Sequence, residues 1–168
     1  MSQKIELKQY DHSWPEKFQI EKAVLNVALE GFVYGAIEHV GSTSIPGLMA
    51  KPVIDIMVGV KSLELSKPCI QILEKHNYKY FPYKIDVMHW FCKPSDKFRT
   101  HHLHLIPYQS ELWKERIKFR DLLLSNDSVF KGYQSLKLEL AKKYENDREK
   151  YTQEKWPFIK KALEKNEH

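Results

Sequence analysis

The feature that most constrains this chain is the apolar run from Val53 to Val60. It is interrupted by one carboxylate, Asp55, and one glycine, Gly59. An apolar run of this length between turn signals predicts a strand that is buried on both faces. A carboxylate in such a strand is costly unless it is paired or binds a metal ion. The run therefore predicts a central strand whose charged side chain belongs to a site.

A short polar turn precedes this strand. It consists of Gly41, Ser42, Thr43 and Ser44. Glycine and serine let the backbone turn tightly and leave N–H and hydroxyl donors uncovered, an arrangement that suits a phosphate group. Lys51 adds a positive charge for a phosphoryl oxygen. The alternative is structural, because Thr43 or Ser44 before Pro46 also fits the cap of a short helix.

The second informative stretch is His101–Ile106. In a strand, side chains alternate between faces, so His102 and His104 point to one face and His101 to the other. Two imidazoles on one face could bind a metal, move protons or contact a phosphate. No cysteine or carboxylate pattern accompanies them, so they do not specify zinc.

The predicted elements have a mixed order. We expect strands at 32–39, 53–60, 78–81, 87–92 and 101–106, and helices at 14–30, 62–76, 111–124, 130–144 and 152–163. A further short strand at 5–7 and a turn or short helix at 46–50 complete the pattern. This order favours an α/β or α+β sheet with helices packed on it. We predict one domain over 1–168, with a helical C-terminal part at about 111–165.

Details of three helices follow from local signals. Ser13 is the predicted N-cap of the first helix, with Pro15 in its first turn. In the last helix Trp156 belongs to the predicted apolar stripe, and Pro157 lies near the helix start, where proline is tolerated. Arg120 with Asp121 is either a solvent-facing pair or part of a binding site.

Composition limits the class of protein. The 168 residues are 42% hydrophobic and 29% charged, as in soluble globular proteins, and no apolar stretch approaches the length of a membrane span. The first ten residues contain no apolar signal region, so a cytoplasmic location is expected. Cys69 and Cys92 form no metal or redox motif. The net charge of +5 permits an anionic partner such as a nucleotide, and supports RNA only weakly.

The segment around the polar turn resembles the signature of the GrpB family. The resemblance is carried by Glu38-His39-Val40-Gly41-Ser42-Thr43-Ser44-Ile45-Pro46-Gly47-Leu48 and by Ala50-Lys51-Pro52-Val53-Ile54-Asp55-Ile56. It extends over most of the chain, through Trp14-Pro15, His102-Leu103-His104, Phe119-Arg120-Asp121 and Tyr151 with Lys155. That family is placed in the nucleotidyltransferase superfamily. The resemblance therefore implies a nucleotidyltransferase-like mixed sheet flanked by helices.

The superfamily resemblance also implies a site. Its enzymes carry Gly-Ser on a turn before a strand with paired acidic residues, and a third acid comes from a neighbouring strand. These carboxylates hold a divalent metal that bridges the triphosphate. Gly41 and Ser42 match the turn, and Asp55 matches one acidic position. Neither residue two positions from Asp55 is acidic, and His102 and His104 stand where the third acid is expected.

These differences from the superfamily pattern imply a different site, with one metal ion. Its expected ligands are Asp55, His104, Glu38 and His39, with Mg²⁺ or Mn²⁺ as the ion and Zn²⁺ as an alternative. Phosphate would contact the turn residues and the basic side chains Lys51, Arg99 and Arg120. Asp55, His102 and His104 are the expected catalytic residues.

Three functions are compatible with these residues. The first is a metal-assisted enzyme that transfers a nucleotidyl or phosphoryl group from a nucleotide to an unknown acceptor. The second is a nucleotide- or phosphate-binding regulatory module that has lost turnover, which the missing acids favour. The third is an interaction protein that meets its partner through the C-terminal helices. We rank the first slightly above the second, because many reactive side chains gather around one turn.

Overall fold

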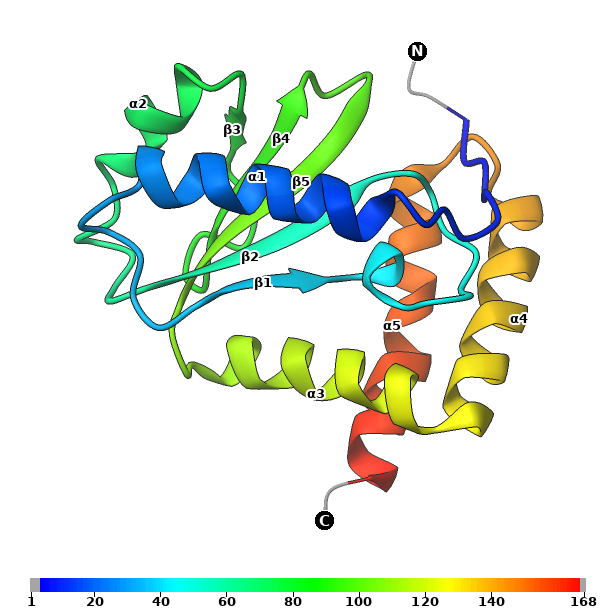
Figure 1. Cartoon of the computed structure of the whole chain (residues 1–168). Helices are drawn as coiled ribbons and strands as arrows, with labels where there is room; N and C mark the ends of the chain where they lie inside the picture. The colour runs from blue at the N-terminus through cyan, green and yellow to red at the C-terminus, as the bar shows by residue number, and fades with distance from the viewer. Residues whose placement is uncertain (1–3, 167–168) are drawn as a thin grey trace.

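The computed structural model describes residues 4–166 and contains a five-stranded sheet in the order β1–β2–β5–β4–β3 (Figure 1). The strands are β1 (Ile37–Val40), β2 (Ile54–Val60), β3 (Lys79–Phe81), β4 (His89–Pro94) and β5 (Arg99–Pro107). β2 and β5 are parallel neighbours, and the other pairs are antiparallel. The predicted α+β class is confirmed, and the strand predicted at 53–60 is the second strand from one edge.

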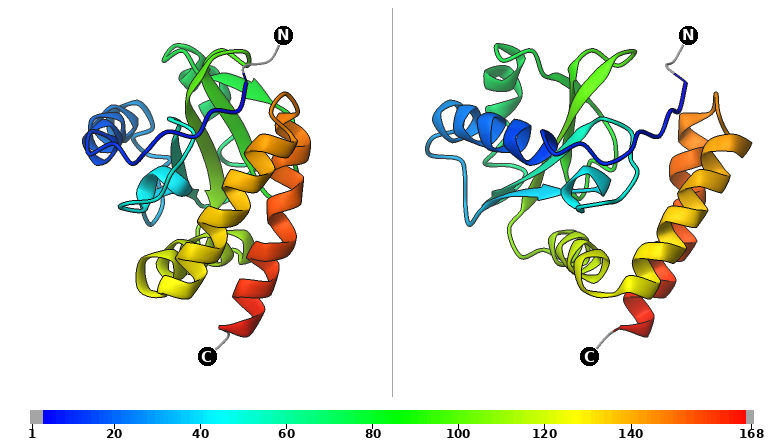
Figure 2. Two further views of the ribbon diagram at one scale, coloured as in Figure 1. Left: turned by 90° about the vertical axis from the view of Figure 1, so that its right-hand side faces the viewer. Right: turned by 45° about the vertical axis from the view of Figure 1, so that its right-hand side comes forward.

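Helices cover both faces of the sheet. They are α1 (Trp14–Ala28), α2 (Cys69–Glu74), α3 (Glu111–Ser125), α4 (Asp127–Lys143) and α5 (Arg148–Lys165), with one 3₁₀ turn, η1 (Ser42–Ser44). Figure 2 shows α1 and α5 on opposite sides of the sheet. No helix among residues 4–166 combines the length and the apolar character needed to cross a membrane.

Alternate residues of β2 face two different layers. Ile56 and Val58 pack with Leu25 of α1 in the main core. Met57 packs with Trp113 of α3 in a second core on the opposite face. Because side chains alternate along a strand, Asp55 shares the face of Met57, on the side of α3.

The C-terminal helices hold the loop that leads from η1 to β2. Ile45 and Leu48 of this loop are buried against Tyr133 of α4. The ammonium of Lys137, also on α4, donates a hydrogen bond to the backbone oxygen of Met49. The position of the polar turn therefore depends on helices that lie about ninety residues further along the chain.

Local signals were only partly right at two helix starts. Ser13 occupies the predicted N-cap position of α1, but its side chain makes no capping hydrogen bond, and its N–H donates to Asp11 Oδ1 at 2.8 Å. The helix predicted at 62–76 is shorter, because Pro68 occupies its N-cap and the helix begins at Cys69. Proline disfavours helical geometry in the residue before it, so the segment before Pro68 forms turns instead.

Further expectations are corrected at the two ends of the chain. Residues 5–7 form no strand; the adjacent Lys8 makes an isolated bridge with Ala50. α5 begins at Arg148, four residues earlier than predicted, with the side chain of Asp147 accepting from the N–H of Lys150. This earlier start places Pro157 inside the helix. Trp156, expected on the apolar stripe, is 47% exposed.

Candidate functional site around Asp55

Asp55 and two histidines form a cluster on the face of the sheet that α3 covers. The parallel register places Asp55 beside His102 and Met57 beside His104, so the two imidazoles follow each other along β5. His102 Nδ1 lies 3.1 Å from Asp55 Oδ1, and His104 Nε2 lies 3.6 Å from the same oxygen. The structure thus brings together the three residues that the sequence predicted as catalytic.

The partners of each imidazole fix its tautomer. A guanidinium nitrogen of Arg116 lies 2.9 Å from His104 Nδ1. Because a guanidinium only donates, His104 Nδ1 accepts and its proton is on Nε2, facing Asp55. Asp55 accepts from His102 Nδ1, which leaves a lone pair on His102 Nε2. That nitrogen is buried and has no hydrogen-bond partner among the described residues.

The cluster holds one negative charge at neutral pH. Burial raises the pKa of Asp55, but hydrogen bonds from His102 and His104 outweigh burial and keep this pKa well below its usual range. Burial, with the positive charge of Arg116, lowers the pKa of His104 to about 4. Burial also lowers the pKa of His102. Asp55 is therefore ionised while both imidazoles are neutral, and His102 Nε2 carries an unpartnered lone pair.

Gly41 lies directly against the carboxylate of Asp55. Its backbone has φ +73° and ψ −177°, a region that is essentially limited to glycine. A Cβ at this position would lie 2.3 Å from Asp55 Oδ2. Two independent constraints, conformation and space, thus require glycine here, which is the physical basis of the Gly-Ser turn.

The other hydroxyls of the turn have structural partners. Thr43 is 1% exposed, donates to the backbone oxygen of Val53 at 3.1 Å and lies 3.0 Å from His39 Nε2. The hydroxyl of Ser44 donates to the backbone oxygen of Gly41. These contacts favour the structural alternative for Thr43 and Ser44. The side chain of Ser42 makes no such hydrogen bond among residues 4–166. Its predicted contact with a phosphate therefore stays a prediction.

Positive side chains gather beside Asp55. Lys51 Nζ lies 5.2 Å from the ring centre of Tyr151, and Lys155 Nζ lies 4.6 Å from the same ring. Burial, with the charge of Lys155, lowers the pKa of Lys51 to about 7; Arg148 and Arg99 act in the same direction, and Asp55 opposes them. We call Lys51, Arg99, Arg148 and Lys155 the basic cluster.

Two more buried polar groups adjoin the basic cluster. Lys137 is 2% exposed, and burial together with the charges of Lys155 and Lys51 holds its pKa well below the usual range. Tyr151 is fully buried, and its hydroxyl has no hydrogen-bond partner among the described residues. The surroundings of Asp55 are therefore rich in positive charge and in unused hydrogen-bonding capacity.

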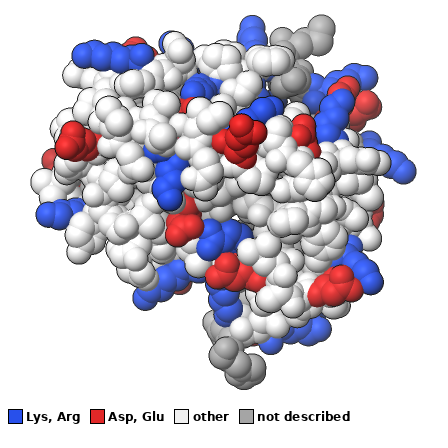
Figure 3. Space-filling model, in the orientation of Figure 1, with Lys and Arg blue, Asp and Glu red and all other residues white. Residues whose placement is uncertain are grey.

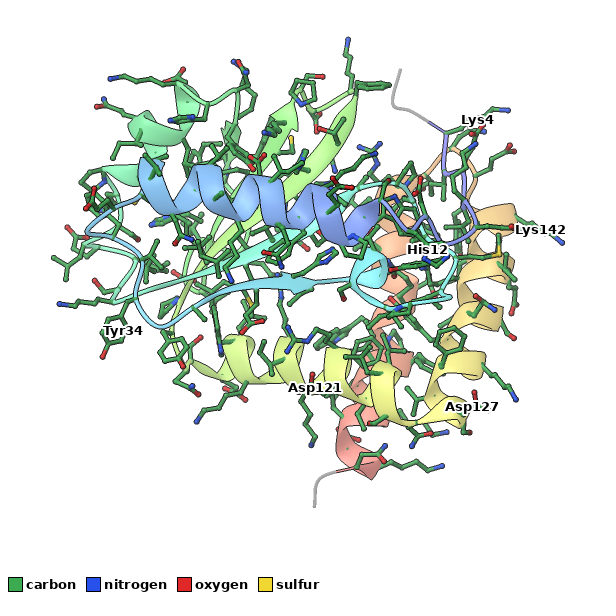
Figure 4. All side chains as sticks on the ribbon, viewed as in Figure 1. Lys4, His12, Tyr34, Asp121, Asp127 and Lys142 are labelled. Atoms are coloured by element: carbon green, nitrogen blue, oxygen red, sulfur yellow. The ribbon has the colours of Figure 1, made fainter. Side chains whose placement is uncertain are left out.

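The remaining predicted residues lie at a different place. Glu38, His39, Ser44 and Arg120 line a groove of about 540 Å³ between α1, β1 and α3. Arg120 pairs with Glu38 at 2.8 Å and also donates to the backbone oxygen of His39. It contacts Asp121 as well, which lies on α3 as labelled in Figure 4. Arg120 is thus satisfied by the protein, and it does not belong to the basic cluster.

The structure does not assemble the four expected metal ligands. Among residues 4–166, no group of three or more histidine, cysteine or acidic side chains is arranged to hold a metal ion. His39 stacks on Phe18 of α1, with ring centres 4.8 Å apart, so it points to the face opposite Asp55. Glu38 is held by Arg120. Adjacent strand residues face opposite layers, which separates His39 from the cluster.

Several residues of the site were not predicted as such. Arg116 sits within the amphipathic pattern of α3 and carried no signal of its own. Tyr151 and Lys155 lie four residues apart, one helical turn, so they share a face of α5. That spacing, together with their place in the family signature, was the one available signal. Lys137 and Arg148 were indistinguishable from the many basic residues of the C-terminal helices.

The fold and site define an α+β protein with a buried carboxylate beside two histidines and a glycine turn. The GrpB protein family model matches residues 4–165, and the chain belongs to this family. The chain is 40% identical over 159 residues to "Glutamate-rich protein GrpB" of Alkalihalophilus pseudofirmus, covering 92% of this chain and 91% of that protein.

A second relative and a solved structure agree. "UPF0157 protein YqkA" of Bacillus subtilis is 33% identical over 162 residues, which cover 96% of this chain but 47% of that protein. The crystal structure of the conserved protein GrpB from Enterococcus faecalis superposes with a TM-score of 0.85 at 28% identity. It covers 97% of this chain and 100% of that chain. These comparisons support the fold and family; they name no activity.

Replacing Gly41 tests the contact between the turn and Asp55. Gly41→Ala should lower the free energy of unfolding by about 3 kcal/mol or more, because it adds a clash to a strained backbone. Gly47→Ala is the matched control: φ is +83°, but the nearest atom to its Cβ, in Phe130, is 3.9 Å away. It should cost about 1–2 kcal/mol. Urea denaturation measures both, and equal losses would contradict a specific contact with Asp55.

The lowered pKa of Lys51 predicts a pH-dependent stability. Its pKa falls from 10.5 to about 7 on folding, so the charged form is disfavoured in the native state. This cost is full below pH 7, declines as the pH rises through the window to 10.5, and vanishes above it. Lys51→Met should therefore stabilise the protein at pH 6 by more than about 1.4 kcal/mol, one pKa unit.

That gain should diminish towards pH 10. Lys61→Met, at an exposed position beyond the end of β2, is the control and should show little difference between pH 6 and pH 9. A gain from Lys51→Met that is independent of pH would mean that its ammonium is not disfavoured by burial.

Proposed function

We propose that this protein binds a phosphorylated small molecule, a nucleotide in the first instance, with its phosphates beside Asp55 and the basic cluster. The observation that carries this proposal is the convergence of Lys51, Arg99, Arg148 and Lys155 on a region with two carboxylates, Asp55 and the Asp96 that pairs with Arg99. These side chains are partly buried, and cations removed from water are costly unless anions compensate them. A phosphate group supplies that compensation, and its binding would raise the pKa of Lys51 again.

The distribution of surface charge favours a small ligand over a nucleic acid. In Figure 3, basic and acidic side chains are interspersed over the visible face, rather than gathered in a basic stripe. Extended contact with a phosphate backbone depends on many basic residues along one surface. The local concentration of positive charge beside Asp55 is better matched to one compact polyanion.

Group transfer is the second part of the proposal, and it is supported by the pair Asp55–His102. Asp55 accepts from His102 Nδ1, and the unpartnered lone pair of the buried His102 Nε2 would take the proton of an attacking hydroxyl that reaches it. Arg116 orients His104, whose Nε2 lies 3.6 Å from Asp55 Oδ1. The same carboxylate thus orients the proposed base. Without the lone pair of His102 Nε2, the protein would bind a nucleotide but would not catalyse transfer.

The residues around Asp55 could hold one divalent ion, but only together with the phosphates of the ligand. Val53 and Met57 stand two positions from Asp55, where a two-metal site needs acids. Mg²⁺ is often held by one or two carboxylates together with substrate phosphates, and Asp55 with bound phosphate oxygens matches that description. When bound, such an ion would neutralise phosphate charge. We therefore propose Mg²⁺ or Mn²⁺ as an aid to nucleotide binding through Asp55, with Zn²⁺ as the alternative.

Binding is tested by titrating the purified protein with ATP and with tripolyphosphate, in the presence and absence of Mg²⁺, Mn²⁺ or Zn²⁺. Lys155→Ala should weaken binding about tenfold, because a charged contact to phosphate contributes about 1.5–3 kcal/mol. Lys160→Ala removes the same charge from an exposed position on α5 and is the matched control. Asp55→Asn should abolish any dependence on the metal. No binding of either polyphosphate would overturn the proposal.

Transfer is tested with α- and γ-labelled ATP and hydroxyl acceptors, by following the release of pyrophosphate or ADP. His102→Asn keeps a donor near the position of Nδ1 but removes Nε2. It should lower turnover at least about 100-fold, the usual contribution of a general base, without weakening ATP binding. Turnover unaffected by this change would exclude His102 as the base. Binding without turnover in the wild type would leave the regulatory module as the function.

A further inference from the structure

Two exposed aromatic side chains from different elements lie near the proposed phosphate site and contact the same lysine. Tyr83 lies in the loop between β3 and β4, and Trp156 lies on α5; they are 50% and 47% exposed. Aromatic rings at this exposure leave a large apolar area in water, which the core does not require. Both were outside the residues that the sequence pattern assigned to a site.

One lysine lies between these two rings. Lys84 Nζ is 5.5 Å from the ring centre of Tyr83 and 5.9 Å from that of Trp156. Both distances are within the range of a cation–π contact. The ammonium therefore contacts the π faces of both rings. Lys84 has a positive φ of +48°, and its loop carries two other exposed apolar residues, Ile85 and Val87.

A continuous row of rings joins this space to Asp55. Tyr83 and Trp90 have ring centres 6.3 Å apart, and Trp90 and His102 have ring centres 5.4 Å apart. The guanidinium of Arg99, part of the basic cluster, lies 5.1 Å from the ring of Trp90. His102 in turn contacts Asp55. The two exposed rings are thus connected to the phosphate site through direct side-chain neighbours.

The electrostatics agree with this placement. Burial lowers the pKa of Arg116, while Asp55 and Tyr83 both act on it in the opposite direction. Arg116 also binds His104. Tyr83 therefore lies near the site, although it follows β3, the edge strand furthest from β1.

We propose that Tyr83 and Trp156 form the binding slot for the base of the nucleotide, and that Lys84 fills this slot until the ligand displaces it. The proposal rests on the proposed function, because it assumes phosphates at the basic cluster. A base offers two π faces and stacks on aromatic rings regardless of its identity. The displaced ammonium of Lys84 is then free to approach the ligand phosphates. The slot accordingly predicts affinity for nucleotides over bare polyphosphates, with little discrimination between bases.

The test compares ATP, GTP and tripolyphosphate by calorimetric titration. Stacking should make both nucleotides bind the wild type at least about tenfold more tightly than tripolyphosphate. Trp156→Leu and Tyr83→Leu should each remove most of this advantage and leave tripolyphosphate affinity unchanged. Phe98→Leu is the control, since Phe98 is another exposed aromatic residue, 58% exposed, outside the slot. Quenching of tryptophan fluorescence by ATP should be reduced in Trp156→Leu and unchanged in Phe98→Leu, with Trp90 as the remaining tryptophan near the site.

The outcomes separate this proposal from the proposed function. Equal affinity of the wild type for ATP and tripolyphosphate would overturn the slot and retain the phosphate site. An advantage of ATP that survives both leucine variants would also overturn the slot. Failure of both ligands to bind would overturn the two proposals together. Lys84→Met should increase the advantage of ATP over tripolyphosphate, because no ammonium then competes with the base for the slot; a smaller advantage would contradict displacement.

Discussion

The contact on which the site depends is that between the carboxylate of Asp55 and the backbone of Gly41. Asp55 occupies a strand that is otherwise apolar and carries its charge into the space between the sheet and the C-terminal helices. Gly41 passes so close to it that no other residue fits. Hydrogen bonds from His102 and His104 keep the charge ionised. The site therefore combines a buried charge, its two donors and a turn that only glycine can form.

The C-terminal helices are part of this site. α4 fixes the loop between η1 and β2 through Tyr133 and Lys137, and α5 places Lys155 and Tyr151 beside Lys51. The sheet alone provides the carboxylate and the imidazoles, whereas most of the positive charge comes from outside it. A nucleotide bound as proposed would contact both parts of the chain and would give the helical extension a role in binding in addition to its role in packing.

The predicted site residues divide into two groups that the fold keeps apart. Asp55, His102 and His104 meet on one face of the sheet, with Lys51 and Arg99 nearby. Glu38, His39, Ser44 and Arg120 line the groove beside α1. His39 points to the face opposite Asp55, because neighbouring side chains of a strand alternate between faces. Glu38 is held by Arg120. The four-ligand metal set failed for these two reasons, while the histidine pair at spacing two was predicted correctly.

The sequence by itself determined the buried strand with its carboxylate, the glycine turn, the shared face of His102 and His104, and membership of the GrpB family. These features depend on local periodicity, on backbone conformation, and on a long continuous motif. Only the tertiary structure decided that β2 and β5 are neighbours, that Arg116 fixes a tautomer, and that Trp156 is exposed. Contacts between residues far apart in the chain arise from packing, which no local pattern records. The basic cluster is the clearest case, since its members come from the loop before β2, from β5, and from α5.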